Sequence, residues 1–353
     1  MFDLAQCGIG VIAPLDESFR ERVQYTLDHK TKPVGSLGVV EELALHISLI
    51  QKTLTPSLQK PHALIFAGDH GICDEGISAF PQAVTSQMVT NFLAGGAAIS
   101  VLAQQNNMAL NVIDAGVIGE FESHPKLINK KIAPGTKNFA CEPAMSLVQA
   151  QQAIAAGADV VQSVFTQGCN TVLMGEMGIG NTTCAAALMH WITEQPIEQC
   201  VGAGTGLALH GVQHKAAVIK AAMVLHRPQL ITPLHALATL GGFEIAMLVG
   251  AYLKAASLGM TILVDGFICT AALAIASQMN KQVLAYCIFT HSSAEQGHVL
   301  LLQYLKAKPL LNLNMRLGEG SGAAMAYPLL ASAVAILNTM ASFDEAGVSG
   351  KNA

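Results

Sequence analysis

Short apolar runs alternate with longer stretches of helical spacing along most of this chain. Six runs have the length and continuous apolarity of strands that are buried on both faces of a sheet. These runs are His62–Ala67, Leu110–Ala115, Thr171–Gly175, Gln199–Gly202, Met260–Val264 and Leu284–Phe289. Helical spacing is found at residues 82–102, 145–156, 182–193 and 292–306. The alternation predicts an α/β fold with a parallel, six-stranded, Rossmann-like sheet that is flanked by helices.

The ends of the predicted strands indicate where the functional site lies. In open parallel sheets, ligands bind beyond the carboxyl ends of the strands. The residues at these ends are glycine or polar: Gly68-Asp69-His70, Gly116, Glu176, Gly204, Asp265 and Thr290-His291. We therefore expect the functional site at this edge of the sheet.

Both ends of the chain lie outside the alternation of strands and helices. We expect residues 30–320 to form a large α/β catalytic domain. Residues 1–29 and 321–353 are expected to pack together as a small helical domain.

The composition is unusually apolar, because 52% of the 353 residues are hydrophobic and only 12% are charged. A membrane-spanning helix needs about 20 mostly apolar residues, whereas the best candidate, residues 322–337, is shorter and contains Pro328. We therefore expect no membrane span and interpret the apolarity as the buried interface of a homo-oligomer. The net charge of −5, without any basic run, argues against nucleic acid as a partner.

The eight cysteines are scattered along the chain, and none forms a C-x-x-C pair. This spacing argues against a metal or redox motif and favours buried free thiols in a reducing compartment. The N-terminus lacks the basic start and long apolar core of a signal peptide. We expect a cytoplasmic protein without a metal ion or another cofactor.

The first candidate site is GEMGIGNTT, residues 175–183, which follows a predicted strand and opens a helix. Glycines allow close approach of a ligand, and the N-terminus of a helix binds anions such as phosphate. Asn181, Thr182 and Thr183 are able to cap the helix and to donate hydrogen bonds. A plain helix cap after a tight turn remains the alternative, since no Walker A lysine follows.

A second glycine-rich segment, GAGTGL at residues 202–207, is followed by Lys215 in the next helical stretch. A lysine in this place is able to bind a phosphate as a point charge. The alternative is an ordinary solvated lysine.

The third candidate is MRLGEGSGA, residues 315–323, in which Glu319 stands between glycines ahead of an apolar helix. Poor solvation would raise the pKa of this carboxyl group and make it a general base near neutral pH. The alternative is a charge that only stabilises the helix N-terminus. Four flexible residues in succession favour the functional interpretation.

Two further segments suggest a metal-dependent hydrolase. AGDHGI, residues 67–72, contains Asp69 and His70, and HSSAEQGH, residues 291–298, contains two histidines and Glu295. The spacing of the second segment does not match H-E-x-x-H, and a metal site would need further ligands. A polar turn at the end of a strand is the preferred interpretation of Asp69-His70.

Taken together, these segments resemble the nicotinate-nucleotide:dimethylbenzimidazole phosphoribosyltransferase family. The matching strings occur in the family order over about residues 30–325, and only the set as a whole is specific. They are KPVGSLG, AGDHGI, DEGISAFPQAVT, GTKN, EPAMS, GEMGIGNTT, GGFEIA, DGFI, HSSAEQGH and MRLGEGSGA.

The resemblance implies a homodimer with a large α/β domain and a small helical domain from both chain ends. It implies transfer of phosphoribosyl from nicotinate mononucleotide to 5,6-dimethylbenzimidazole, with inversion at C1′. The products are nicotinate and α-ribazole 5′-phosphate, which is used in assembly of the cobalamin nucleotide loop.

The family's functional positions are carried over residue by residue. Glu319 matches the catalytic carboxylate, and Glu176 matches a second active-site carboxylate. The positions around phosphate and ribose are Gly178, Gly180, Asn181, Thr182, Lys215 and Ser293. The benzimidazole pocket would use Phe80, Gln87, Met88 and Leu317.

Three rival functions stay open at this point. One is a hydrolase that uses Asp69-His70 and a metal ion, and another is a regulator that binds nucleotide without catalysis. A nearer alternative is a paralogue that activates phenols or other bases, because residues 206–215 lack the acidic stretch of many relatives and Phe80 occupies a variable pocket position.

Overall fold

The computed structural model describes residues 2–204 and 206–349. Six parallel strands form one sheet in the order β3-β2-β1-β4-β5-β6, the strand order of the Rossmann fold. The strands are β1 (His62–Gly68), β2 (Ala109–Gly116), β3 (Leu127–Asn129), β4 (Thr171–Met177), β5 (Thr261–Val264) and β6 (Cys287–Phe289). The predicted fold class is therefore confirmed.

Two details of the predicted strand set are wrong. Residues 199–202 form the end of helix α7 (Ile197–Cys200) and the following loop, not a strand. Pro196 starts this helical turn, in which the N–H groups of Cys200 and Val201 donate to the carbonyl oxygens of Pro196 and Ile197. The sixth strand is instead β3, a three-residue edge strand that is only partly buried and therefore has no continuous apolar run.

Alternate side chains of the central strands enter two separate cores, as expected for a sheet that is covered on both faces. Leu64 and Phe66 of β1 join one core, whereas Ile65 between them joins the other. The first core is shared with α5 (Leu147–Thr166), α6 (Asn181–Thr193), α8 (Leu209–His226), α9 (Pro233–Leu240), α10 (Phe243–Ser257), α11 (Phe267–Met279) and α12 (Gln296–Tyr304). The second core is shared with α1 (Arg20–Asp28), α2 (Val39–Gln51), α3 (Val84–Ala94), α4 (Ala98–Gln105) and α13 (Ser321–Thr339).

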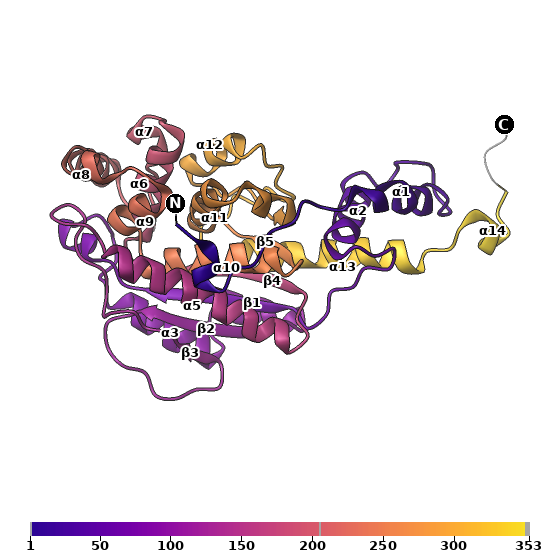
Figure 1. Ribbon diagram of the computed structural model, residues 1–353, viewed down its shortest axis with the longest axis horizontal. Coiled ribbons are helices and arrows are strands. Elements are labelled where there is room, and N and C mark those ends of the chain that lie inside the picture. Colours follow the sequence, from indigo (N-terminus) through magenta and orange to yellow (C-terminus); the bar gives the residue numbers. More distant parts are fainter. Residues whose placement is uncertain (1, 205, 350–353) are drawn as a thin grey trace.

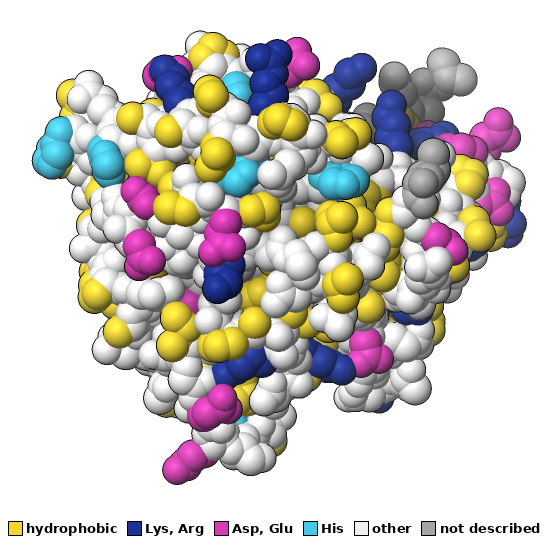
Figure 2. Space-filling model, turned by 60° about the vertical axis from the view of Figure 1, so that its left-hand side comes forward, with side chains coloured by type: hydrophobic (Ala, Val, Ile, Leu, Met, Phe, Trp, Pro, Cys, Tyr) yellow, Lys and Arg dark blue, Asp and Glu magenta, His cyan; other side chains and the backbone are white. Residues whose placement is uncertain are grey.

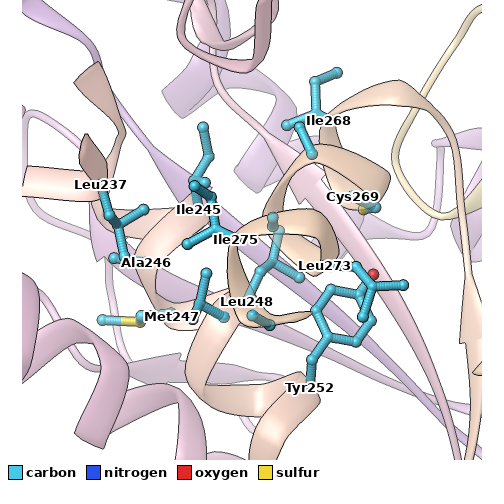
Figure 3. Close-up of a cluster of buried hydrophobic side chains, with 14 of the residues drawn as sticks. Leu237, Ile245, Ala246, Met247, Leu248, Tyr252, Ile268, Cys269, Leu273 and Ile275 are labelled. Carbon is cyan, nitrogen blue, oxygen red and sulfur yellow. The ribbon is translucent and has the colours of Figure 1, made fainter. Parts of the chain in front are cut away.

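Helix α10 is at the centre of the first core and contacts α5, α11 and four strands. Its side chains interdigitate with those of α9 and α11, for example Leu248 and Tyr252 with Leu273 (Figure 3). Helices α5 and α10 approach so closely that a Cβ on Gly157 or Gly250 would lie 1.9 Å from a carbonyl oxygen of the other helix. This packing fixes α10, whose first turn lies under the candidate site.

Helices α1 and α2 pack together, and α2 packs along α13, at the end of the molecule that also carries α14 (Phe343–Ala346) (Figure 1). The first residues of the chain pack elsewhere, against helices that cover the sheet. The short helix η1 (Leu4–Cys7) contacts α5, and the Gly8 carbonyl accepts a hydrogen bond from Lys254 Nζ on α10. The division into residues 30–320 and a small helical domain of 1–29 plus 321–353 stays a prediction. Residues 1 and 350–353 of that domain lie outside the described residues.

Two stretches, Val84–Gln105 and Ser321–Thr339, have the length and apolarity of membrane-crossing helices. The first is divided at Gly95 into α3 and α4. The second, α13, is half buried and packs against α2 and α4, as a core helix does. On the face shown in Figure 2, basic side chains are interspersed with acidic and apolar ones rather than gathered in one patch.

Candidate active site

A cavity of about 280 Å³ opens at the carboxyl edge of the sheet, next to the ends of β4 and β5. The residues that follow these strands, and the loop that leads into α13, form its walls. Of the predicted site residues, nine line it: Phe80, Met88, Glu176, Gly178, Asn181, Thr182, Ser293, Leu317 and Glu319. The strand order reverses between β1 and β4, so the cavity lies close to the switch point where this fold binds ligands.

Glu319 lies in a turn of left-handed backbone that precedes α13. Gly318, Glu319 and Gly320 all have positive φ, of 84°, 65° and 80°. Asp265, which follows β5, holds this turn by accepting hydrogen bonds from the N–H groups of Gly320 (3.1 Å) and Ala323 (2.9 Å). A non-glycine residue with positive φ is strained, and such strain is concentrated at functional sites. The turn thus presents one carboxylate at a fixed place.

The Glu319 carboxyl group is poorly solvated and poorly partnered. The residue is 6% exposed, and its Oε2 has no hydrogen-bond partner among the described residues. Burial raises the pKa of Glu319 to about 7; the N–H of Ile99 opposes this shift and the Asp265 carboxylate adds to it. A carboxyl group with this pKa is able to accept a proton near neutral pH.

Glu176, the second predicted carboxylate, comes from the end of β4 and is also buried. Its Oε2 accepts a hydrogen bond from Asn181 Nδ2. Burial raises the pKa of Glu176 to about 8; the Asn181 hydrogen bond opposes the shift, while the carboxylates of Asp265 and others add to it. Gly318 packs on this group, since a Cβ there would lie 2.4 Å from Glu176 Oε1. The two glycine-rich loops therefore meet at Glu176.

The polar end of the cavity is formed by the first turn of α6. Gly180 is its N-cap, with φ of 95°, and does not itself line the cavity. Lys215 of α8 lies behind the lining and donates from Nζ to Thr182 Oγ1 (2.7 Å). Burial lowers the pKa of Lys215 to about 8, against the opposing effect of Glu295. A buried cation beside a helix N-terminus is suited to bind an anion.

The other end of the cavity is apolar. Phe80, Met88 and Leu317 line it together with Val84, and Phe80 and Leu317 are about half exposed. Gln87 is exposed and lies outside the lining. Consecutive residues of a helix point about 100° apart, so a face that directs Met88 of α3 inward turns Gln87 away.

Several lining residues were not among the predicted site residues. Arg316 donates from Nη1 to the Gly204 carbonyl (3.4 Å), and it adds a second cation near the polar end. Glu295 and His291 also line the cavity. His291 was signalled by its place after β6 and Glu295 by the polar run 291–298, whereas no sequence pattern singled out Arg316. Thr205 of the GAGTGL segment lies outside the described residues.

Asp69 and His70 are not part of the cavity lining. The Asp69 carboxylate accepts from the N–H of Ile118 (2.7 Å), and the His70 ring is fully buried against Glu244 (2.7 Å). No cluster of three or more His, Cys, Asp or Glu residues in the described part of the chain is arranged to hold a metal ion.

Comparison with known proteins identifies relatives along nearly the whole chain. A sequence model of a family described as phosphoribosyltransferase matches residues 12–348. The nicotinate-nucleotide–dimethylbenzimidazole phosphoribosyltransferase of Cupriavidus necator is 53% identical over 96% of this chain and 97% of its own length. The enzyme of the same name from Janthinobacterium sp. (strain Marseille) is 48% identical, over 98% of this chain and 100% of its own.

A solved structure has the same architecture. The crystal structure of CobT from Thermus thermophilus superposes with a TM-score of 0.91 at 40% identity, and the match covers 95% of this chain and 100% of that one. The resemblance that the ordered segments indicated is therefore confirmed. This chain belongs to the nicotinate-nucleotide–dimethylbenzimidazole phosphoribosyltransferase family.

Proposed function

We propose that this enzyme transfers phosphoribosyl from nicotinate mononucleotide to 5,6-dimethylbenzimidazole, with inversion at C1′. The products are nicotinate and α-ribazole 5′-phosphate, for assembly of the cobalamin nucleotide loop. The observation that carries the proposal is the position of Glu319. Its buried carboxyl group, with a pKa near 7, borders a cavity with an anion-binding end and an apolar end.

The polar end of the cavity is assigned to the 5′-phosphate and ribose of the nucleotide. Thr182 lies in the first turn of α6 and Gly178 in the loop before its N-cap, where the N-terminus of the helix and its dipole favour an anion. Lys215 would reach the phosphate beside Thr182 Oγ1. Ser293 lines the same cavity, and its N–H donates to His298 Nδ1 (2.9 Å), which fixes the backbone there.

The apolar end of the cavity is assigned to the benzimidazole. Phe80, Met88 and Leu317 provide a hydrophobic surface that a flat, apolar ring is able to cover. Because the contacts are apolar, they select for size and shape more than for particular hydrogen-bonding groups. Other bases of similar size therefore remain acceptors to be tested in this proposal.

The reaction needs a leaving group, a nucleophile and a base. The nicotinate ring nitrogen is cationic while it is bonded to C1′, so breaking that bond neutralises the leaving group. The unprotonated nitrogen of dimethylbenzimidazole attacks C1′ from the opposite face, and positive charge develops on the attacking ring. Glu319 accepts the proton from the other nitrogen of that ring, a contribution typically worth about 10²–10⁴ in rate. Alignment of the two rings about one ribose adds up to about 7–11 kcal/mol.

Glu176 is assigned to the ribose and to the positive charge that develops at C1′. Its carboxyl group lies against Gly318 and is held by Asn181. With a pKa of about 8 this carboxyl group is largely protonated at neutral pH, so it orients the ribose through a hydrogen bond, and only its ionised fraction would favour an oxocarbenium-like transition state at C1′.

The assembly and the compartment are part of the same proposal. Large apolar side chains at the cavity mouth, Phe80 and Leu317, are about half exposed, which supports their being covered by the second subunit of a homodimer. All eight cysteines are free, which supports a reducing, cytoplasmic compartment.

Product chromatography tests the proposal. The enzyme is incubated with nicotinate mononucleotide alone, with added dimethylbenzimidazole, and with a panel of phenols and purines. We expect nicotinate and α-ribazole 5′-phosphate in equal amounts, only when the benzimidazole is present, and unchanged in EDTA. Release of nicotinate without an acceptor, or its loss in EDTA, would instead support a metal-dependent hydrolase.

A further inference from the structure

A fully buried triad of side chains lies outside the cavity lining, behind the glycine loop of residues 178–180. The His70 ring, from the turn after β1, contacts Glu244 Oε1 through Nε2 (2.7 Å) and Cys184 Sγ through Nδ1 (3.2 Å). Glu244 belongs to the first turn of α10 and Cys184 to the first turn of α6. All three side chains are inaccessible to solvent. The triad therefore joins three elements that meet beneath the site.

Three glycines pack against this triad. A Cβ on Gly242 would lie 2.2 Å from His70 Cε1, and one on Gly68 would lie 2.9 Å from Glu244 Oε2. A Cβ on Gly178 would lie 2.5 Å from the Gly68 carbonyl oxygen and 3.0 Å from His70 Nε2. None of these glycines has a positive φ, so backbone conformation does not require glycine at these positions. Glycine is required at these positions because a side chain would collide with the neighbouring atoms, which include the His70 ring and the Glu244 carboxylate. Gly178 lines the cavity on its other side, so one residue separates His70 from the ligand space.

The same loop is held from a second direction. The N–H of Ile179 donates to Thr85 Oγ1 (3.1 Å) on α3, and its carbonyl accepts from Cys73 Sγ (3.0 Å). The His70 carbonyl in turn accepts from Gln82 Nε2 (3.2 Å), just before α3. The His70 residue thus connects the phosphate end of the cavity to the helix that carries its apolar wall.

A buried histidine–carboxylate pair is costly to keep. Burial opposes protonation of the ring, but the Glu244 carboxylate and Cys184 outweigh it, so that the pKa of His70 is raised well above its ordinary value. Removing one partner of such a pair leaves an uncompensated buried charge, whereas apolar replacements of both are often tolerated. A pair retained directly beneath a substrate loop is therefore better explained by what it positions than by stability alone.

We propose that His70 and Glu244 are positioning residues that hold Gly178 and the first turn of α6 at the place where the nucleotide phosphate and ribose bind. This inference rests on the proposed function of that end of the cavity. It gives a role to the segments AGDHGI and GGFEIA, whose residues do not line the cavity.

The test separates positioning from stability with two variants. His70→Asn removes the ring behind Gly178 and leaves the Glu244 carboxylate buried without its partner. The double variant His70→Asn with Glu244→Gln also neutralises that carboxylate. We expect the single variant to lower the melting temperature and to raise the Kd and KM for nicotinate mononucleotide at least about tenfold, which equals about 1.4 kcal/mol. The double variant should recover thermal stability but not nucleotide affinity.

The matched control is His226→Asn, at a buried histidine whose Nε2 contacts the Phe139 carbonyl (2.8 Å) away from the cavity. It should lower the melting temperature and leave the Kd unchanged. Recovery of affinity together with stability in the double variant would show a merely structural role and overturn the inference. So would a wild-type Kd in a folded His70→Asn variant.

Calorimetric binding of nicotinate mononucleotide keeps the two proposals separable. If the wild-type enzyme forms no α-ribazole 5′-phosphate, the proposed function fails, while the comparison of Kd values still decides the role of His70. If products form normally and the variants bind as tightly as the wild type, only the positioning role fails. If His70→Asn does not fold, the double variant supplies the Kd comparison.

Discussion

Glu319 and Glu244 are both buried carboxylates at the carboxyl edge of the sheet, yet their surroundings differ in kind. Glu244 is sealed from solvent, bonded to His70 and outside the cavity lining. Glu319 borders the cavity and forms no ion pair with any residue that the structure describes. Burial alone therefore does not distinguish the proposed base. Glu319 differs from Glu244 because, in the described part of the chain, it lacks an ion-pair partner and lines the cavity.

The largest expected effect is at Glu319, a carboxylate without an ion-pair partner among the described residues. Glu319→Gln keeps the shape of the side chain but removes the proton acceptor, so we expect turnover to fall about 10²–10⁴-fold. The Kd for nicotinate mononucleotide, measured by calorimetry, should stay within about twofold, because the base acts only in the transition state. Near-normal nicotinate release by this variant would refute the base role.

A smaller effect is expected at Lys215, the buried cation at the polar end of the cavity. Lys215→Met removes the charged donor that we propose for the phosphate, a contact worth about 1.5–3 kcal/mol. The KM for nicotinate mononucleotide should therefore rise about 10- to 100-fold with less change in kcat. Lys220→Met, at an exposed lysine of the same helix that pairs with Glu198, is the control and should behave as the wild type. Equal effects of both substitutions would contradict a phosphate contact of Lys215.

The free energy of unfolding at alkaline pH distinguishes a buried carboxylate that has an ion-pair partner from one that has none. The pKa of Glu176 is raised from 4.5 to about 8 in the folded protein. The protonated form therefore stabilises the fold fully below about pH 4.5, and this stabilisation is lost as the pH rises through 8. Glu176→Gln fixes the neutral form. We expect it to raise the free energy of unfolding at pH 9 by on the order of 1–3 kcal/mol and to lower activity.

The control is Glu41→Gln, at a buried carboxylate that lies 2.8 Å from Lys32 Nζ. Removing this paired charge should destabilise the protein at the same pH. Denaturant unfolding at pH 6 and pH 9 measures both variants. A loss of stability for Glu176→Gln at pH 9 would mean that its ionised form is well stabilised in the fold.

The smallest expected effect concerns the apolar end of the cavity. Leu317→Ala removes a half-exposed side chain from the proposed base pocket, so the KM for dimethylbenzimidazole should rise only a few-fold, or about 1 kcal/mol. The KM for the nucleotide should not change. Leu313→Ala, at a similarly exposed leucine outside the lining, serves as the control. An effect of Leu317→Ala on the nucleotide alone would place the base elsewhere.

The sequence predicted those parts of the fold in which apolar residues follow one another without interruption. Five buried strands were found because both of their faces are apolar, and Glu176 was placed because parallel strands end at one edge. Residues 199–202 were misassigned because a short, largely apolar run fits one helical turn as well as a strand. The edge strand β3 was missed because it is half solvated and lacks that pattern.

The site was predictable only in part. Glu319 could be predicted because the glycines on both sides of it are visible in the sequence. Asp265 was noticed at a strand end, but its hydrogen bonds to the turn of Glu319 join residues 55 positions or more apart along the chain. The contact between His70 and Glu244 spans 174 positions. Such long-range contacts depend on the packing of α10 and on the loop before α13, which periodicity does not reveal.

The pH dependence of kcat tests the role of Glu319 as the base, with both substrates saturating so that only groups of the bound complex titrate. Burial raises the pKa of Glu319 to about 7 in the free protein, so the wild-type enzyme should lose activity on the acid side, where this carboxyl group is protonated. The residual activity of Glu319→Gln should lack this acid limb. An acid limb at the same pH in Glu319→Gln would contradict Glu319 as the base.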